Sequence, residues 1–182
     1  MFRAKNLLVP IQFLVLGLLC LLGAASCADE ARNLTPPIEI PFSLDKGGEH
    51  LEFEMNIKEK QTYAFGLTFK VKKDEPGDMS RLMRLVGDQG QYPDGRYVDL
   101  GVPLKVKLQV SSDKKNINPF EFNKVETEIA VYSWGADNRN KKITNLLLEP
   151  GIYKVQVENM LAAPDFAGRS INFHIYRAYL GK

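Results

Sequence analysis

Apolar and polar residues alternate along the chain from Ile38 onward, and this period of two is the strongest constraint on the fold. Phe65, Leu67 and Phe69, for example, alternate with Gly66 and Thr68. Successive side chains of a strand point to opposite faces, so this pattern is typical of a strand with one buried face. The segments that show it are 38–42, 51–57, 63–71, 104–110, 125–134, 143–148, 152–157 and 171–175.

One segment has a different period. Met79, Leu82, Met83 and Val86 are spaced as on one face of a helix, and Gly87 follows directly. The spacing predicts a short amphipathic helix, with Asp78 as its N-cap and Gly87 just beyond its end.

About eight strands with turn residues between them and a single helical insertion indicate an all-β protein, a single β-sandwich over residues 38–182. Lys58 to Gln61 is short enough to join two strands as a hairpin. We expect one buried core built from both sheets, formed by Phe53, Phe65, Leu67, Phe69, Val106, Leu108, Tyr153 and Val155.

The first 26 residues have the pattern of an export signal. A short basic start with Arg3 and Lys5 precedes a nearly unbroken apolar run over 7–22. The run is shorter than the roughly 20 residues that a membrane-spanning helix needs. We therefore expect a signal peptide over residues 1–26.

Small residues end this segment, and Cys27 follows Ser26 directly. This order resembles the lipobox of bacterial lipoproteins, with the departure that Ala24 stands where Leu is usual. The resemblance implies that Cys27 is lipidated, that residues 27–37 form a lipidated tether, and, from Ala28, that the domain is held at the outer membrane and faces the periplasm. Cys20 is a weaker candidate, and cleavage by ordinary signal peptidase or an uncleaved anchor are the alternatives.

Several motifs occur together in the order of a known family. They are the lipobox, Pro41–Leu44, Tyr63–Phe69, Leu85–Gly87, Val102–Val106 and Glu149–Val157. The chain resembles an uncharacterised family of proteobacterial β-sandwich lipoproteins, a domain of unknown function, over residues 38–178. The resemblance implies a fold and a compartment, and it brings no catalytic residues.

The sequence contains none of the common catalytic motifs, and we expect no enzyme activity, no cofactor and no metal site. There are two histidines, His50 and His174, and a typical zinc site would need both of them together with a carboxylate. The alternation places His174 at an exposed strand position.

Glu52 and Glu54 share one strand face, which would suit a hydrolase, but a solvated face balanced by lysines is the simpler interpretation. Residues 87–96 are rich in oxygen ligands yet lack calcium-loop spacing, so we interpret them as a crossover.

Two features suggest binding. Trp134 opens a polar run that includes Asp137 and Arg139, at the tip of an expected hairpin. Tryptophan and arginine often dominate protein interfaces, although Trp134 could instead fold inward. The small outer-face residues Ala64, Gly66 and Thr68 would permit close approach by another chain or, as we favour, by other parts of this fold.

Charge excludes one class of partner. The chain has 24 basic and 22 acidic residues, and removal of Arg3 and Lys5 with the signal leaves a neutral domain, so nucleic acid is not expected. We expect a periplasm-facing lipoprotein that binds an unknown protein, such as an immunity or accessory protein for a secreted toxin. A cell-envelope structural or assembly factor and a hydrolase with an unrecognised site are the alternatives.

Overall fold

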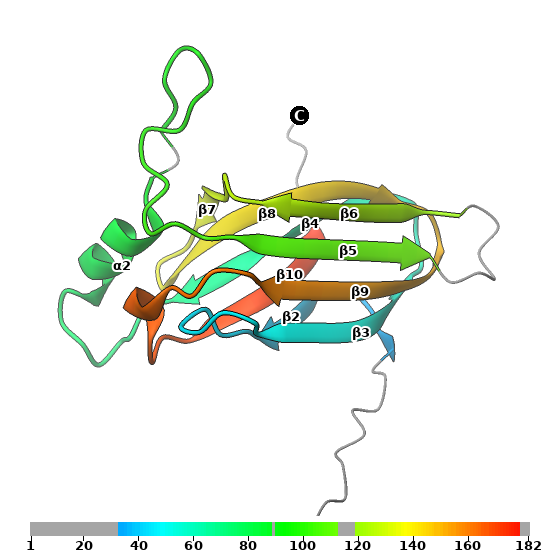
Figure 1. The fold of residues 1–182 in the computed structure, drawn as a ribbon, viewed down its shortest axis with the longest axis horizontal. Helices are drawn as coiled ribbons and strands as arrows, with labels where there is room; N and C mark the ends of the chain where they lie inside the picture. The colour runs from blue at the N-terminus through cyan, green and yellow to red at the C-terminus, as the bar shows by residue number, and fades with distance from the viewer. Residues whose placement is uncertain (1–32, 89, 113–118, 179–182) are drawn as a thin grey trace, which may run out of the picture. The chain divides into compact units, whose positions relative to one another are not determined.

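The computed structural model describes residues 33–88, 90–112 and 119–178. The expected signal peptide and Cys27 lie outside the described residues. Ten strands form two five-stranded sheets, which lie face to face in Figure 1. In spatial order, sheet A contains β1 (Asn33–Leu34), β3 (His50–Ile57), β9 (Gly151–Asn159), β5 (Val106–Ser112) and β6 (Glu121–Glu126). Sheet B contains β2 (Ile38–Pro41), β10 (Ile171–Arg177), β4 (Gln61–Lys70), β8 (Asn138–Leu148) and β7 (Ala130–Trp134).

The sandwich predicted from the alternation is confirmed. All paired strands are antiparallel except β1, which runs parallel to β3. Every member of the predicted core is at most 5% exposed. Phe173 of β10 joins the two layers, because its ring lies 6.3 Å from that of Phe53 in sheet A and 6.4 Å from that of Phe65 in sheet B.

The predicted hairpin at 58–61 is wrong. Strand β3 pairs with β1 and β9, whereas β4 pairs with β10 and β8, so residues 58–60 connect the two sheets. The turn at 149–150 makes a second such connection, between β8 and β9. After each connection a buried tyrosine donates a hydrogen bond to the carbonyl four residues upstream: Tyr63 to Glu59 at 3.2 Å and Tyr153 to Glu149 at 2.9 Å. Alternation marks a strand's buried face but does not identify its neighbours.

Two strand predictions also need correction. The expected strand 125–134 is two strands in different sheets, β6 and β7. Strand β8 begins at Asn138 rather than at 143, because its polar residues find hydrogen-bond partners within the fold. Within the expected tether, Asn33 and Leu34 form β1, which pairs Asn33 with Glu54.

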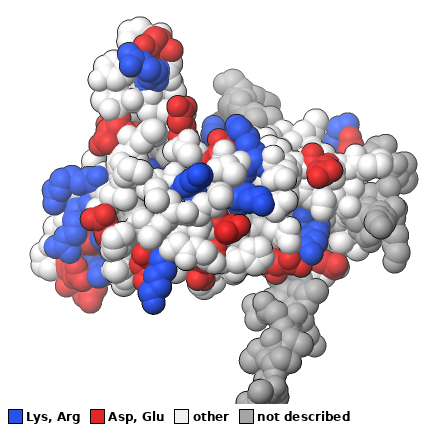
Figure 2. All heavy atoms as spheres, viewed as in Figure 1, with Lys and Arg blue, Asp and Glu red and all other residues white. Residues whose placement is uncertain are grey.

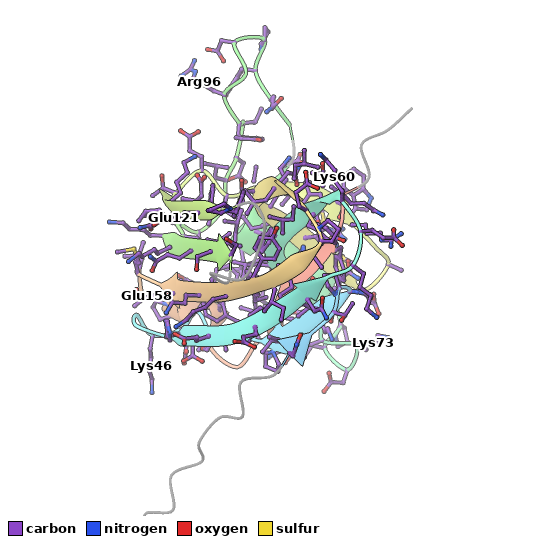
Figure 3. The ribbon with its side chains drawn as sticks, turned by 90° about the vertical axis from the view of Figure 1, so that its right-hand side faces the viewer. Lys46, Lys60, Lys73, Arg96, Glu121 and Glu158 are labelled. Carbon is purple, nitrogen blue, oxygen red and sulfur yellow. The ribbon has the colours of Figure 1, made fainter. Side chains whose placement is uncertain are left out.

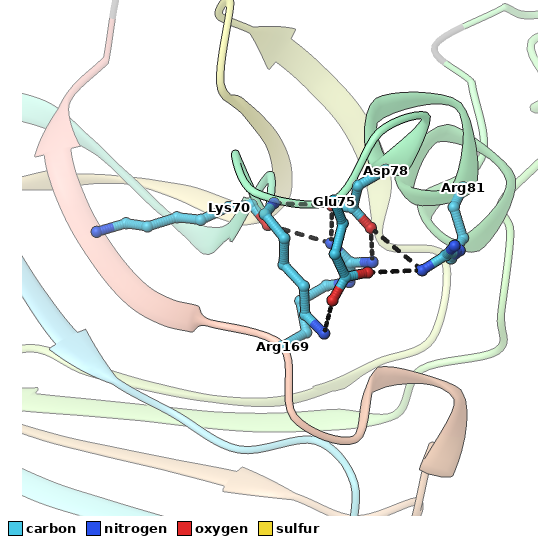
Figure 4. Close-up of polar contacts among 6 residues, drawn as sticks. Lys70, Glu75, Asp78, Arg81 and Arg169 are labelled. Carbon is cyan, nitrogen blue, oxygen red and sulfur yellow. Dashed lines mark hydrogen bonds and ion pairs between the residues drawn. The ribbon is translucent and has the colours of Figure 1, made fainter.

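The helix α2 (Asp78–Val86) ends before Gly87 as predicted, but its buried face differs from the expected one. Met83 is 49% exposed, whereas Leu82 and Val86 are buried together with Asp78. Gly77 in a left-handed conformation occupies the N-cap position. The carboxylate of Asp78 instead accepts hydrogen bonds from the Arg169 guanidinium (Figure 4). It also accepts one from the backbone N–H of Lys72. The short helix η1 (Pro164–Phe166) precedes β10.

No helix within the described ranges is long and apolar enough to cross a membrane.

Candidate functional site

Most of the large apolar side chains that remain exposed gather at one end of the sandwich. In Figure 1, α2, the loop 87–105, the end of the β7–β8 hairpin and the segment after β9 lie together at this end, which we call the helix end. Its exposed apolar residues are Met83, Tyr92, Val98, Trp134, Met160 and Leu161.

Hydrogen bonds join the segments of the helix end. The Lys141 ammonium on β8 donates to the carbonyls of Val86 and Leu100, at 3.0 and 2.7 Å. The backbone of Met160 donates to the Lys105 carbonyl at 2.8 Å. Burial lowers the pKa of Lys141 to about 8. These hydrogen bonds connect β8 to α2 and to the loop 87–105, and connect that loop to the segment after β9.

The three predicted binding residues lie near one another on the β7–β8 hairpin. Trp134 is 57% exposed, so it does not fold inward. Arg139 stands opposite it in the β ladder and donates to the carbonyls of Gly135 and Asn138, at 3.0 and 2.8 Å. Asp137 forms an ion pair with Lys73 at 3.2 Å. Arg139 and Asp137 hold the hairpin, and Trp134 remains available.

The loop 87–105 extends beyond the sheets, and Figure 3 shows Arg96 near its tip. Arg96 forms an ion pair with Asp94 at 2.7 Å and lies 5.6 Å from the centre of the Tyr92 ring. Within the described ranges, no group of three or more histidine, cysteine or acidic residues is placed to hold a metal ion.

The paired carboxylates on β3 face solvent. Glu52 accepts hydrogen bonds from Lys154 and Gln156, and Glu54 is exposed. The hydrogen bond from Lys154 lowers the pKa of Glu52, which is opposite to the shift a general acid needs. Figure 2 shows basic and acidic side chains interspersed across the outer face of sheet A. The arrangement is that of a solvated face.

His174 corrects a sequence prediction, because it is fully buried rather than exposed. Its imidazole lies over Gly66 of β4, where a Cβ atom would come within 2.7 Å of Nε2. At Gly66 the small residue therefore accommodates one of this fold's own side chains, the alternative that we favoured. The alternation could not show this, since it treats every polar strand residue as solvent-facing.

Hydrogen bonds fix the tautomer of His174. The Thr68 hydroxyl donates to Asn140 Oδ1 at 2.8 Å, so it accepts from Nδ1–H of His174 at 2.9 Å. Nε2 then accepts from the Tyr132 hydroxyl at 3.0 Å. Burial lowers the pKa of His174 to about 4, so the imidazole is neutral near pH 7.

Two comparisons with known proteins give matches. A family model described as a domain of unknown function (DUF5625) matches residues 39–177. A crystal structure of a protein from Sulfurospirillum deleyianum is similar in fold, with a TM-score of 0.63 and 23% sequence identity over 78% of this chain and 97% of that chain. No curated protein matches.

Proposed function

The chain belongs to the family described as a domain of unknown function (DUF5625), and from this premise we propose that it is a lipid-anchored protein-binding module of a bacterial cell envelope. The observation that carries the proposal is the concentration of exposed apolar residues at the helix end, with Trp134 57% exposed beside a hairpin fixed by Arg139. Exposed apolar groups gathered in one region commonly mark interaction sites.

The anchor is Cys27, lipidated at the outer membrane with the domain facing the periplasm. In the part of the chain that the structure describes, the strands begin at Asn33, six positions after Cys27. Six residues span at most roughly 20 Å. The domain would remain close to the membrane, where anchoring raises its effective concentration toward partners in the same layer.

Binding is favoured over catalysis because the paired carboxylates lack the environment of an acid catalyst. Glu52 is exposed and held by Lys154. An immunity or accessory role, in which the helix end occupies the active site of a secreted toxin, fits a rigid surface with one large aromatic anchor. An assembly factor would use the same surface on a different partner.

A pair of matched positions tests the proposal. Trp134 and Leu147 are each 57% exposed, but β8 runs from the helix end to the opposite end of the sandwich, where Leu147 lies. A photo-crosslinking residue at each position, expressed in the native envelope, should trap a discrete protein from position 134 and none from 147. Equal labelling from both positions, or none from 134, would overturn the binding surface.

A further inference from the structure

The outer face of sheet B contains a pocket that the proposed protein-binding surface does not use. It has a volume of about 320 Å³, which is within the usual range of small-molecule sites. Ala64 of the central strand β4 lines it beside Tyr132 and Tyr176. Trp134 lies on the opposite face of sheet B. It pairs with Arg139 in the β ladder, and Arg139 pairs with Phe69, whose side chain points into the core. Residues paired in this way share one face of the sheet, so Trp134 is on the core side rather than the outer side.

The two tyrosines are held in place by His174. The imidazole accepts the Tyr132 hydroxyl hydrogen bond, which reaches across from β7 to β10. It also stacks on the Tyr176 ring, with 4.6 Å between ring centres and 16° between planes. The Tyr176 hydroxyl donates in turn to Glu39 on β2. Two aromatic side chains are thus fixed before any ligand arrives, which reduces the entropy lost on binding.

The charged groups that line the pocket are both basic. Lys142 and Arg177 line it, together with the Asn145 amide, and no described acidic residue does. Arg177 forms an ion pair with Glu59 at 2.9 Å. Lys142 is half-buried, and within residues 33–88, 90–112 and 119–178 no carboxylate forms an ion pair with it. Its ammonium is available to a ligand.

We propose that this pocket binds a small organic carboxylate with a flat apolar body. The body would pack against Tyr132 and Tyr176 above Ala64, and the carboxylate would accept a charge-assisted hydrogen bond from Lys142. Ligand binding in this pocket would not require the proposed protein partner.

The test uses benzoate as the probe and benzamide as its uncharged match, added to the purified full-length protein. Amide chemical shifts of Ala64, Tyr132 and Lys142 should move with benzoate and saturate, while benzamide should bind at least tenfold more weakly. Lys142→Met should weaken benzoate binding at least tenfold. Lys107→Met is the matched control, because Lys107 is also a half-buried strand lysine but lies in sheet A, and it should change the affinity less than twofold.

A second variant tests the pocket by filling it. Ala64→Leu should abolish the shifts, and a thermal melt establishes that the variant is folded. If Ala64→Leu does not fold, Lys142→Met alone decides the outcome. Equal affinity for benzoate and benzamide, unchanged affinity in Lys142→Met, or no saturable shift in the native protein would each overturn the proposal.

Discussion

Arg169 donates two parallel hydrogen bonds to Asp78, from Nη1 to Oδ2 at 2.8 Å and from Nη2 to Oδ1 at 2.7 Å (Figure 4). Both side chains are buried, at 4% and 0% exposure. This pair holds the start of α2 against the segment that leads into β10. The hydrogen bond from Arg169 keeps the pKa of Asp78 well below its usual range.

We expect Asp78→Ala to destabilise the fold by about 3–5 kcal/mol, because it leaves the buried guanidinium without its partner. Urea denaturation measures the free energy of unfolding. Glu59→Ala is the control, since its pair with Arg177 is exposed on both sides, and it should cost at most about 1 kcal/mol. Similar losses in both variants would contradict a special role for the buried pair.

Phe65→Ala should destabilise the protein by roughly 3–5 kcal/mol, because Phe65 is fully buried and its removal leaves a cavity between the sheets. Leu147→Ala, at an exposed position of the neighbouring strand β8, should change stability by less than about 1 kcal/mol. Thermal melts of the two variants compare them. Equal melting temperatures would show that the strand faces are wrongly assigned.

The buried His174 predicts a loss of stability in mild acid. Its pKa is about 4 in the fold, against 6.5 for the ordinary group. Between these values the unfolded chain binds a proton that the folded chain does not, so stability falls as pH decreases from 6.5 to 4, by on the order of 3 kcal/mol. His174→Gln removes this dependence while other groups are unchanged. Denaturation at several pH values gives the free energy of unfolding of the native protein and of the variant. Plotted against pH, the two curves should be parallel above pH 7 and converge below it. Curves that stay parallel throughout would refute the assignment.

Lys141 predicts a slope of the same sign at alkaline pH. Burial lowers its pKa from 10.5 to about 8, so between these values the unfolded chain retains a proton that the folded chain has lost. Stability due to this group therefore rises with pH from about 8 to 10.5. Lys141→Met should lack the rise, as measured by denaturation at pH 7.5 and 9.5. The prediction would be contradicted if the free energy of unfolding of the native protein did not rise, relative to that of this variant, between these two pH values.

Cys27→Ser should abolish lipidation, since the thiol is the expected acceptor. Metabolic labelling with palmitate should mark the native protein and not the variant, and the variant should leave the membrane fraction. Cys20→Ser is the control variant, and it should still be labelled with palmitate. Incorporation into Cys27→Ser would place the lipid elsewhere.

The alternation of apolar and polar residues was enough to determine that the chain forms a sandwich and which side chains build its core. Burial of one strand face is a local consequence of the period of two, so Phe53, Phe65 and Val155 could be assigned to the core without knowing their neighbours. A different period, with apolar residues three and four positions apart, identified the helix that ends before Gly87. Trp134 was recognised as a candidate anchor from residue type and its place in a polar run.

Only the tertiary structure determined which strands pair and which polar residues are buried. Residues 58–60 connect two sheets because β3 pairs with β1 and β9, whereas β4 pairs with β10 and β8. His174, Lys141 and Asp78 are buried because partners from other elements satisfy their hydrogen bonds, namely Thr68 with Tyr132, two backbone carbonyls, and Arg169. A polar side chain can leave water only when such partners converge, and that convergence depends on residues up to 106 positions apart.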